Sequence, residues 1–366
     1  MRKRSIFKAS RNAYGHCMAD WKPSAASLKC IEGNVMVHRI LMESQKAETW
    51  RFASNDSNDS SAANRRSSGF FAKSSILCFT SRAFLSLLLV VSLLLAGCMR
   101  LGVRSVSTLV PEWRTALFEE CDPILAREAL PANLKMMEGL LRVDPENRRL
   151  LVALSMGFTG YAMMFLEHEA PERASALLLR ARDYGLCALG RRGPDIEKAA
   201  LHPKRLSPLL EALGPEHLEP LFWSALAWSS WIRLNLDDPA AAARINAAQA
   251  CIERAIELDG DYFHGLPYVA MGTVLAARPP LLGGDPEEAK TCFERALSLH
   301  QGRFLLAKLY FARYYAVRVQ DRRLFLNLLD EIEDTDPRIM KQACLFFSGP
   351  AHRALHPGTR RGTLGS

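Results

Sequence analysis

Apolar and polar positions recur with a helical period along most of the chain from about residue 122. Apolar residues lie three and four positions apart, as on one face of an amphipathic helix, and the strict alternation typical of strands is missing from the sequence. Asp-Pro, Gly-Gly and Gly-Pro pairs interrupt the pattern where turns are expected. The sequence therefore predicts an all-α domain. Helices are expected at residues 123–142, 147–168, 171–191, 219–236, 239–258, 262–277, 286–299, 303–318 and 321–333.

Three of these helices share a motif in which a small residue is followed four positions later by a bulky apolar one and then by another small one. Second helices of tetratricopeptide repeats carry this pattern. The small residues let paired helices approach closely, and the bulky residue fills the groove between them. The copies are irregularly spaced, so we predict an irregular tetratricopeptide-like array of helical hairpins. The three sets are Ala174, Leu178 and Ala181; Ala248, Ile252 and Ala255; and Ala289, Phe293 and Ala296.

A short apolar run precedes this domain. Residues 83–96, AFLSLLLVVSLLLA, are about 14 residues long and follow Lys73 and Arg82. A membrane-spanning helix needs roughly 20 apolar residues, so the run has the length of a signal-peptide core. The lipobox LAGC ends at Cys98. We predict cleavage before Cys98 and modification of its thiol and amino group by diacylglycerol and an N-acyl chain, which together anchor a protein stably. The alternative is an uncleaved or buried helix that ends in a chance cysteine.

The remaining segments divide the chain into parts of different character. Residues 1–72 are rich in Ser, Asn and Arg without helical period, which is typical of disorder or of a mis-assigned start. Residues 73–97 form the predicted signal peptide and residues 98–337 the helical domain. Residues 338–366 form an atypical tail that carries five basic and no acidic residues.

The net charge of +8 lies in the part expected to be removed. Residues 1–97 contain 14 Lys or Arg and 6 Asp or Glu, which leaves 33 residues of each sign from Cys98 onward. The exported domain is therefore neutral overall, and it lacks the cationic surplus that phosphate binding requires. We expect no nucleic-acid partner.

Catalytic and metal-binding motifs are missing from the sequence. It contains no G-x-S-x-G, no G-x-x-x-x-G-K and no H-E-x-x-H, and its nine Cys include no C-x-x-C pair. Cys187, Cys251 and Cys292 fall within apolar helical patterns, where a thiol packs as a small hydrophobe. We predict a protein that is not an enzyme and holds no metal and no cofactor besides the lipid on Cys98.

Two aromatic clusters are the best candidates for a ligand cleft. Trp223, Trp228 and Trp231 alternate with Ala and Ser in LFWSALAWSSWIRL, and Tyr310 and Tyr314 lie four residues apart in a helix that is apolar nearly all round. Arg313 lies among these rings and requires a carboxylate, a ring face or a ligand anion. The alternative is ordinary core packing with Arg313 extended toward solvent.

Five blocks resemble the T-component (TatT) family of tripartite ATP-independent periplasmic (TRAP) transporters. They occur in the family's order and cover roughly residues 98–337. After Pro337 the chain departs from the family, which usually continues into a further helix. The blocks are GFTGYAMMFLEHEA at 157–170, LLLRARDYGLCALGRR at 177–192, LFWSALAWSSWI at 221–232, PPLLGGDPEEAKTCFERALSL at 279–299 and YFARYYAVRVQDRRLF at 310–325.

The resemblance implies a periplasmic protein, lipid-anchored to the inner or outer membrane, whose helices surround a central pore or cleft. It also implies a homotrimer that docks the solute-binding P-component and passes a hydrophobic small molecule to or from it. A structural scaffold for envelope assembly is the alternative function. Carried onto this chain, the resemblance assigns the anchor to Cys98 and the cleft to Phe158, Tyr161, Trp223, Trp228, Tyr310, Arg313 and Tyr314.

Overall fold

The computed structural model describes residues 99–336, and the helical domain lies in the unit that begins at Gly102. Within the described residues the chain forms helices and no strands, which confirms the all-α prediction. The predicted leader, Cys98 and the predicted tail lie outside the described residues. In chain order the helices are α4 (Val110–Phe118), α5 (Pro123–Val143), α6 (Arg148–Tyr161), η2 (Ala162–Leu166), α7 (Pro171–Ala188), α8 (Arg192–Ala199), α9 (Pro203–Glu211), η3 (Pro215–His217), α10 (Leu218–Leu234), α11 (Pro239–Ala242), α12 (Ile245–Asp259), α13 (Tyr262–Ala277), η4 (Pro280–Leu282), α14 (Pro286–Leu299), α15 (Leu305–Tyr310), η5 (Phe311–Ala316) and α16 (Arg322–Glu333).

Asp-Pro pairs start three of these helices. Asp122, Asp238 and Asp285 each cap a helix by accepting hydrogen bonds from backbone N–H groups of the first turn. A proline follows each of them at the first helical position, where its missing N–H costs no hydrogen bond and its fixed φ suits the helix. The turn signals in the sequence are therefore the physical starts of α5, α11 and α14.

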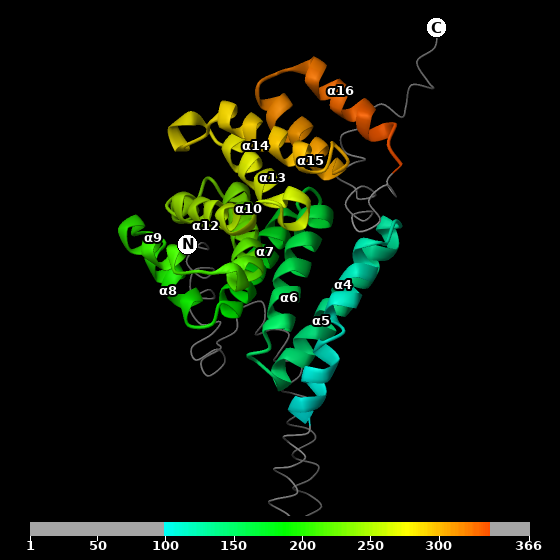
Figure 1. Ribbon diagram of the computed structural model, residues 1–366, viewed down its shortest axis with the longest axis vertical. Coiled ribbons are helices and arrows are strands. Elements are labelled where there is room, and N and C mark those ends of the chain that lie inside the picture. The colour runs from blue at the N-terminus through cyan, green and yellow to red at the C-terminus, as the bar shows by residue number, and fades with distance from the viewer. Residues whose placement is uncertain (1–98, 337–366) are drawn as a thin grey trace, which may run out of the picture. The chain divides into compact units, whose positions relative to one another are not determined.

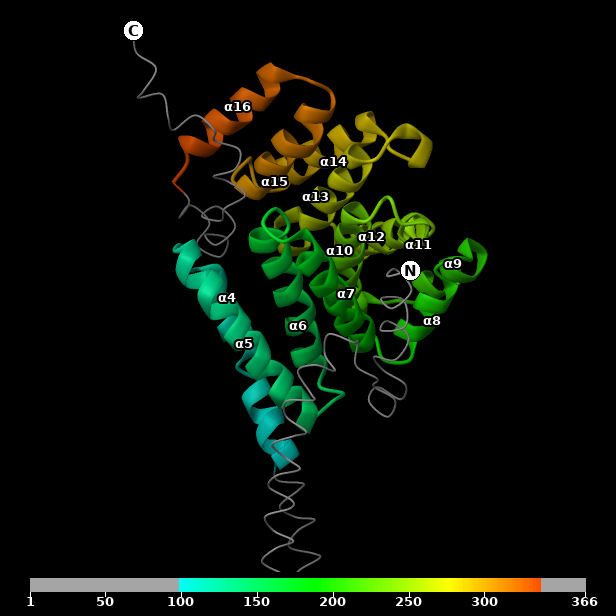
Figure 2. The same cartoon turned by 180° about the vertical axis from the view of Figure 1, so that it is seen from behind.

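Helices that are close in the sequence are also neighbours in space (Figures 1 and 2). The helix α7 packs against both α6 and α10, α12 packs against α10 and α13, and α14 packs against α13 and α15. The short helix α8 packs against α7, and α9 packs against α8 and α12. Each motif-bearing helix thus packs against one helix that precedes it in the chain and one that follows it.

All nine motif residues are fully buried. Phe293 of α14 fits against Gly272 of α13 so closely that a Cβ at Gly272 would lie 2.9 Å from the ring and 3.1 Å from the Ala289 carbonyl oxygen. This is the close approach that small residues were predicted to allow. Cys251 and Cys292 are buried in the same helices and Cys187 is half-buried, as expected of small apolar side chains.

Residues Arg148–Leu166, which form α6 and η2, are long and apolar enough to cross a membrane, with a mean hydropathy of 1.5. In this fold 72% of that apolar window is buried inside the protein. The segment therefore serves as a core helix, because α5, α7 and α10 pack around it.

Several helices differ from the sequence prediction. The helices α4, α8 and α9 were not predicted, since prolines lie within or beside them and their apolar stripes are short. The helix predicted at 239–258 is divided into α11 and α12 by a turn at residues 243–244. Both errors concern short elements, where tertiary contacts override the periodic signal.

The helix predicted at 262–277 begins with a left-handed turn. Phe263, His264 and Gly265 have φ values of 49°, 62° and 80°. Only Gly265 adopts this conformation without strain. Ring contacts hold Phe263 in place, since it packs edge-on against Phe118 at 5.1 Å and Trp223 at 5.8 Å between centroids.

Candidate ligand-binding cavity

A cavity of about 1060 Å³, counted out to its open mouth, lies between α6, η2, α10, α13, α15 and η5. The helices α10 and α13 supply its longest walls. Lining positions recur three and four residues apart along both, so one face of each helix is presented to the cavity. From α10 the lining includes Trp223, Leu226, Ser229, Ser230 and Arg233, and from α13 it includes Leu266, Val269, Ala270, Thr273, Val274 and Ala277.

Two π-helical segments form the opposite side. The segment η2 contributes Met163 and Met164, and η5 contributes Tyr314 directly after Tyr310 of α15. A π-turn widens a helix by one residue and re-aims the side chains that follow, and such turns are frequent at functional sites. Methionine side chains are flexible and polarizable, so this wall can adapt to ligands of different shape.

Hydrogen bonds fix the orientation of Trp223, the largest ring in the lining. Its indole N–H donates to the Tyr262 hydroxyl at 3.0 Å, and this hydroxyl donates to Glu219 at 3.3 Å. Arg114 completes the chain with an ion pair to Glu219 at 3.0 Å. The polar edge of the indole is therefore satisfied within the protein.

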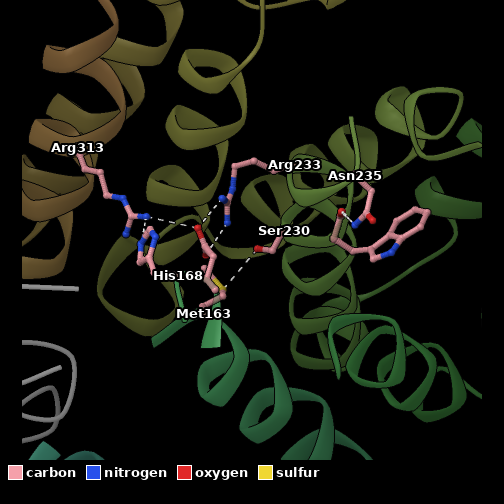
Figure 3. Close-up of polar contacts among 8 residues, drawn as sticks. Met163, His168, Ser230, Arg233, Asn235 and Arg313 are labelled. Carbon is pink, nitrogen blue, oxygen red and sulfur yellow. Dashed lines mark hydrogen bonds and ion pairs between the residues drawn. The ribbon is translucent and has the colours of Figure 1, made fainter. Parts of the chain in front are cut away.

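Tyr314 lies beside an ion cluster at the edge of the cavity. Arg233 forms two parallel hydrogen bonds to the Glu167 carboxylate, at 2.6 and 2.7 Å, and Arg313 reaches the same carboxylate at 3.4 Å. The guanidinium carbons of Arg233 and Arg313 lie 5.4 and 5.1 Å from the centre of the Tyr314 ring. Figure 3 shows Arg233 and Arg313 approaching from different elements, with His168 beside Arg313.

The charges in this cluster determine its protonation. Burial alone would raise the pKa of Glu167, but the charge and hydrogen bonds of Arg233, with the charge of Arg313, lower it below its ordinary value. Burial, reinforced by Arg313, lowers the pKa of His168. The cluster therefore holds a carboxylate and two guanidiniums at neutral pH, with His168 neutral.

Three of the predicted cleft residues line the cavity: Trp223, Tyr310 and Tyr314. The Tyr310 and Tyr314 rings lie 5.4 Å apart, as their spacing of four residues predicts. Arg313 is adjacent but is not part of the lining, because Glu167 and the Tyr314 ring occupy its guanidinium.

Phe158, Tyr161 and Trp228 do not line this cavity. Phe158 stacks on Tyr184 at 6.0 Å, with Arg180 over its ring, and Tyr161 packs against Phe165. Trp228 is 1% exposed, and the Arg182 guanidinium lies 5.4 Å from its ring centre. These three rings pack in the core of this fold. Ordinary core packing was the alternative to a ligand cleft in the sequence analysis. They occupy other faces of the same helices, and a local aromatic pattern cannot identify which face is hollow.

Sequence reasoning missed the polar residues of the site. Arg233 and Arg278 line the cavity, and Glu167 compensates Arg233 from behind it. Each follows a long apolar run: Glu167 closes GFTGYAMMFL, Arg233 closes LFWSALAWSSWI, and Arg278 closes LPYVAMGTVLAA. A lone charge at the end of a buried apolar helix requires a partner or a ligand, and this signal could have identified all three.

Comparison with known proteins gives two findings. A family model described as "TRAP transporter T-component" matches residues 119–348, more than half of the chain. An "Uncharacterized protein" of Treponema pallidum (strain Nichols) is 28% identical in an alignment that covers 55% of this chain and 72% of the relative. The family match includes every cavity residue named above, and it extends past Pro337.

Proposed function

The chain belongs to the TRAP transporter T-component family, and from this premise we propose that it is a lipid-anchored periplasmic accessory of a TRAP-type transport system. This is a family of transporter accessory proteins and not an enzyme family. In the proposed role, the helical domain binds the solute-binding P-component and holds a hydrophobic ligand. The membrane component of the transporter, and not this chain, drives uptake.

The cavity is the observation that supports a ligand-carrying role. Most of its lining is aliphatic, aromatic or methionine, with few polar groups, which is the usual composition of a small-molecule site. Apolar side chains that face an open space lose packing contacts with neighbouring atoms, which costs stability. A ligand that fills the space would compensate for the missing contacts.

The order of the helices supports the tetratricopeptide-like part of the proposal. The motif helices α7, α12 and α14 each pack against one helix that precedes them in the chain and one that follows, and their motif residues are buried. Such arrays bury a continuous core by stacking and leave a curved surface for partners. We assign docking of the P-component, homotrimer formation and a pore through the array to this proposal on the strength of family membership.

The proposed lipid anchor is supported by the sequence alone. The lipobox ends at Cys98, one residue before the described part of the chain begins. The periplasmic location follows from the same leader, with the anchor in the inner or outer membrane. Acylation would hold the domain at a membrane surface, where a transporter could receive its ligand.

Capture of partners from the envelope tests the proposal. The full-length chain with a C-terminal tag is expressed in its own bacterium, crosslinked in living cells and purified from solubilised envelope. We expect mass spectrometry to identify a TRAP solute-binding protein, and we expect palmitate labelling of the wild type but not of Cys98→Ser. The reason is that serine at position 98 lacks the thiol that accepts the diacylglycerol.

An unrelated tagged lipoprotein from the same envelope serves as the matched control, because it shares the anchor but not the helical domain. Capture of the solute-binding protein by both would show only a common location. Envelope-assembly factors without any solute-binding protein would contradict the transport role and favour a scaffold. An unlabelled wild type would contradict the anchor.

A further inference from the structure

The lining of the cavity is positively charged. Of the residues that form it, two are arginines, Arg233 and Arg278, and none is Asp, Glu, Lys or His. An apolar cavity for a purely hydrophobic ligand would contain no cation, because a buried charge costs stability unless it is compensated. The two arginines therefore require separate explanations.

Arg233 is compensated within the protein. Both ends of its guanidinium pair with the two oxygens of Glu167, whose side chain is 5% exposed. A bidentate pair of this kind uses the donors at the end of the guanidinium fork, and the same carboxylate also pairs with Arg313. Arg233 contributes shape and cation–π contact to the lining, and it leaves little charge for a ligand.

Arg278 has no such compensation among residues 99–336. It is 5% exposed, and its contact there is a hydrogen bond of 2.7 Å from Nη1 to the Gln249 amide oxygen, which is neutral. The Gln249 amide in turn donates to Glu253 at 2.9 Å, so Glu253 attracts Arg278 only from beyond an intervening side chain. A guanidinium has five N–H donors, and Gln249 accepts from one end of it.

Arg278 is nevertheless charged and well positioned. Burial lowers its pKa to about 10, which leaves the guanidinium protonated at neutral pH. Its backbone is held by the turn that follows α13, because Gly284 passes so close to the Arg278 carbonyl that a Cβ there would collide with it. A buried cation with a fixed backbone and unused donors is suited to bind an anion.

Ser229 provides a second unsatisfied group in the lining. Its side chain lies on the cavity face of α10, Ser229 is 7% exposed, and its Oγ makes no hydrogen bond within the described residues. Buried hydroxyls are normally paired, so an orphaned one in a ligand cavity indicates a polar atom that the ligand supplies.

We propose that the cavity binds an amphiphilic carboxylate, with the apolar body against the walls of α10 and α13 and the carboxylate on Arg278. This inference rests on the proposed ligand-carrying function and adds the chemical class of the ligand. The planar guanidinium matches a carboxylate in geometry and charge. Phosphate groups carry more charge and are bound by several cationic or backbone N–H donors, whereas Arg278 is the one arginine of this lining without a carboxylate partner among the described residues.

Three probes with the same ten-carbon chain test the inference: decanoate, methyl decanoate and decyl phosphate. The full-length chain is placed in lipid nanodiscs, and binding is measured by titration calorimetry at pH 7 with empty nanodiscs as the blank. We expect decanoate to bind about tenfold or more tightly than methyl decanoate, although the ester is the more apolar probe. Tighter binding of decyl phosphate than of decanoate would overturn the choice of carboxylate.

Substitution of Arg278 identifies the residue responsible. Arg278→Gln is expected to weaken decanoate binding by about 10- to 100-fold and to leave methyl decanoate nearly unchanged. Arg303→Gln makes the same change in net charge at an exposed residue outside the lining, and it is expected to have no effect. If Arg278→Gln does not fold, Arg278→Lys retains the charge, and it is expected to keep part of the preference for decanoate over its ester.

The outcomes distinguish a failure of the Arg278 assignment from a failure of the proposed ligand-carrying function. Equal binding of decanoate and its ester, or an unchanged preference in Arg278→Gln, would overturn the assignment of the carboxylate to Arg278 while the apolar-ligand function stands. Binding of none of the three probes would contradict the ligand-carrying function itself. A preference for decanoate that disappears in Arg278→Gln supports both.

Discussion

Phe293→Ala is expected to destabilise the protein by about 3–5 kcal/mol, because it leaves a cavity between α13, α14 and η5. Phe293 is fully buried, its ring stacks on Phe311 at 5.1 Å, and it fills the space against Gly272. The cost depends on how far the surrounding side chains can relax into the space that the ring leaves. Urea unfolding followed by circular dichroism measures the loss in the free energy of unfolding.

Leu281→Ala is the control for this substitution. Leu281 is 95% exposed in the turn after α13, so its truncation removes apolar atoms without leaving a cavity. A change within about 0.5 kcal/mol is expected. A similar loss in both variants, or a small loss in Phe293→Ala, would show that the motif helices are not packed as described.

Glu167→Gln is expected to cost about 3 kcal/mol, because it leaves Arg233 buried without its counter-charge. The variant keeps the shape of the side chain and removes only the charge that pairs with two guanidiniums. Glu169→Gln is the matched control two residues along the chain. Its carboxylate pairs with Arg127 at an exposed position, where ion pairs contribute little, so its unfolding curve is expected to be close to that of the wild type.

The difference in stability between the wild type and Glu167→Gln is expected to depend on pH in a definite direction. The folded-state pKa of Glu167 is lowered, so its contribution to stability is fully present above the unfolded value of 4.5 and is lost as the pH falls through the folded pKa. The difference between wild type and variant is therefore expected to be constant from pH 7 to about pH 5 and to shrink in stronger acid. A difference that grows on acidification would contradict the ion pair.

The sequence predicted those parts of the fold that depend on local periodic signals. Asp-Pro pairs located the starts of α5 and α14, and the small–bulky–small motif identified residues that are fully buried. The left-handed turn at Phe263 and the π-turns of η2 and η5 could not be predicted in this way. The left-handed turn is held by contacts between distant segments, such as Phe263 with Phe118, that no local window contains.

The candidate site was predictable only in part, for a related reason. The aromatic pattern indicated Trp223, Tyr310 and Tyr314, which line the cavity, but it gave equal weight to Trp228, which does not. On a helix that is apolar all round, periodicity does not distinguish the face against a neighbour from the face against a hollow. A buried charge is more specific, because Arg278 in an apolar environment requires an anion that the described part of the chain does not provide.

Native mass spectrometry of protein purified from its own cells tests most directly whether the cavity carries a ligand with an apolar body. Ala270 lines the cavity on α13 and is 4% exposed, so Ala270→Trp is designed to fill the space from the wall. A variant that retains the helical circular dichroism of the wild type is the required comparison. We expect wild-type protein to carry a non-covalent ligand with an apolar body that is released on denaturation, and we expect Ala270→Trp to be empty. Wild-type protein without any bound molecule, or the same molecule bound equally to both, would contradict the ligand-carrying function.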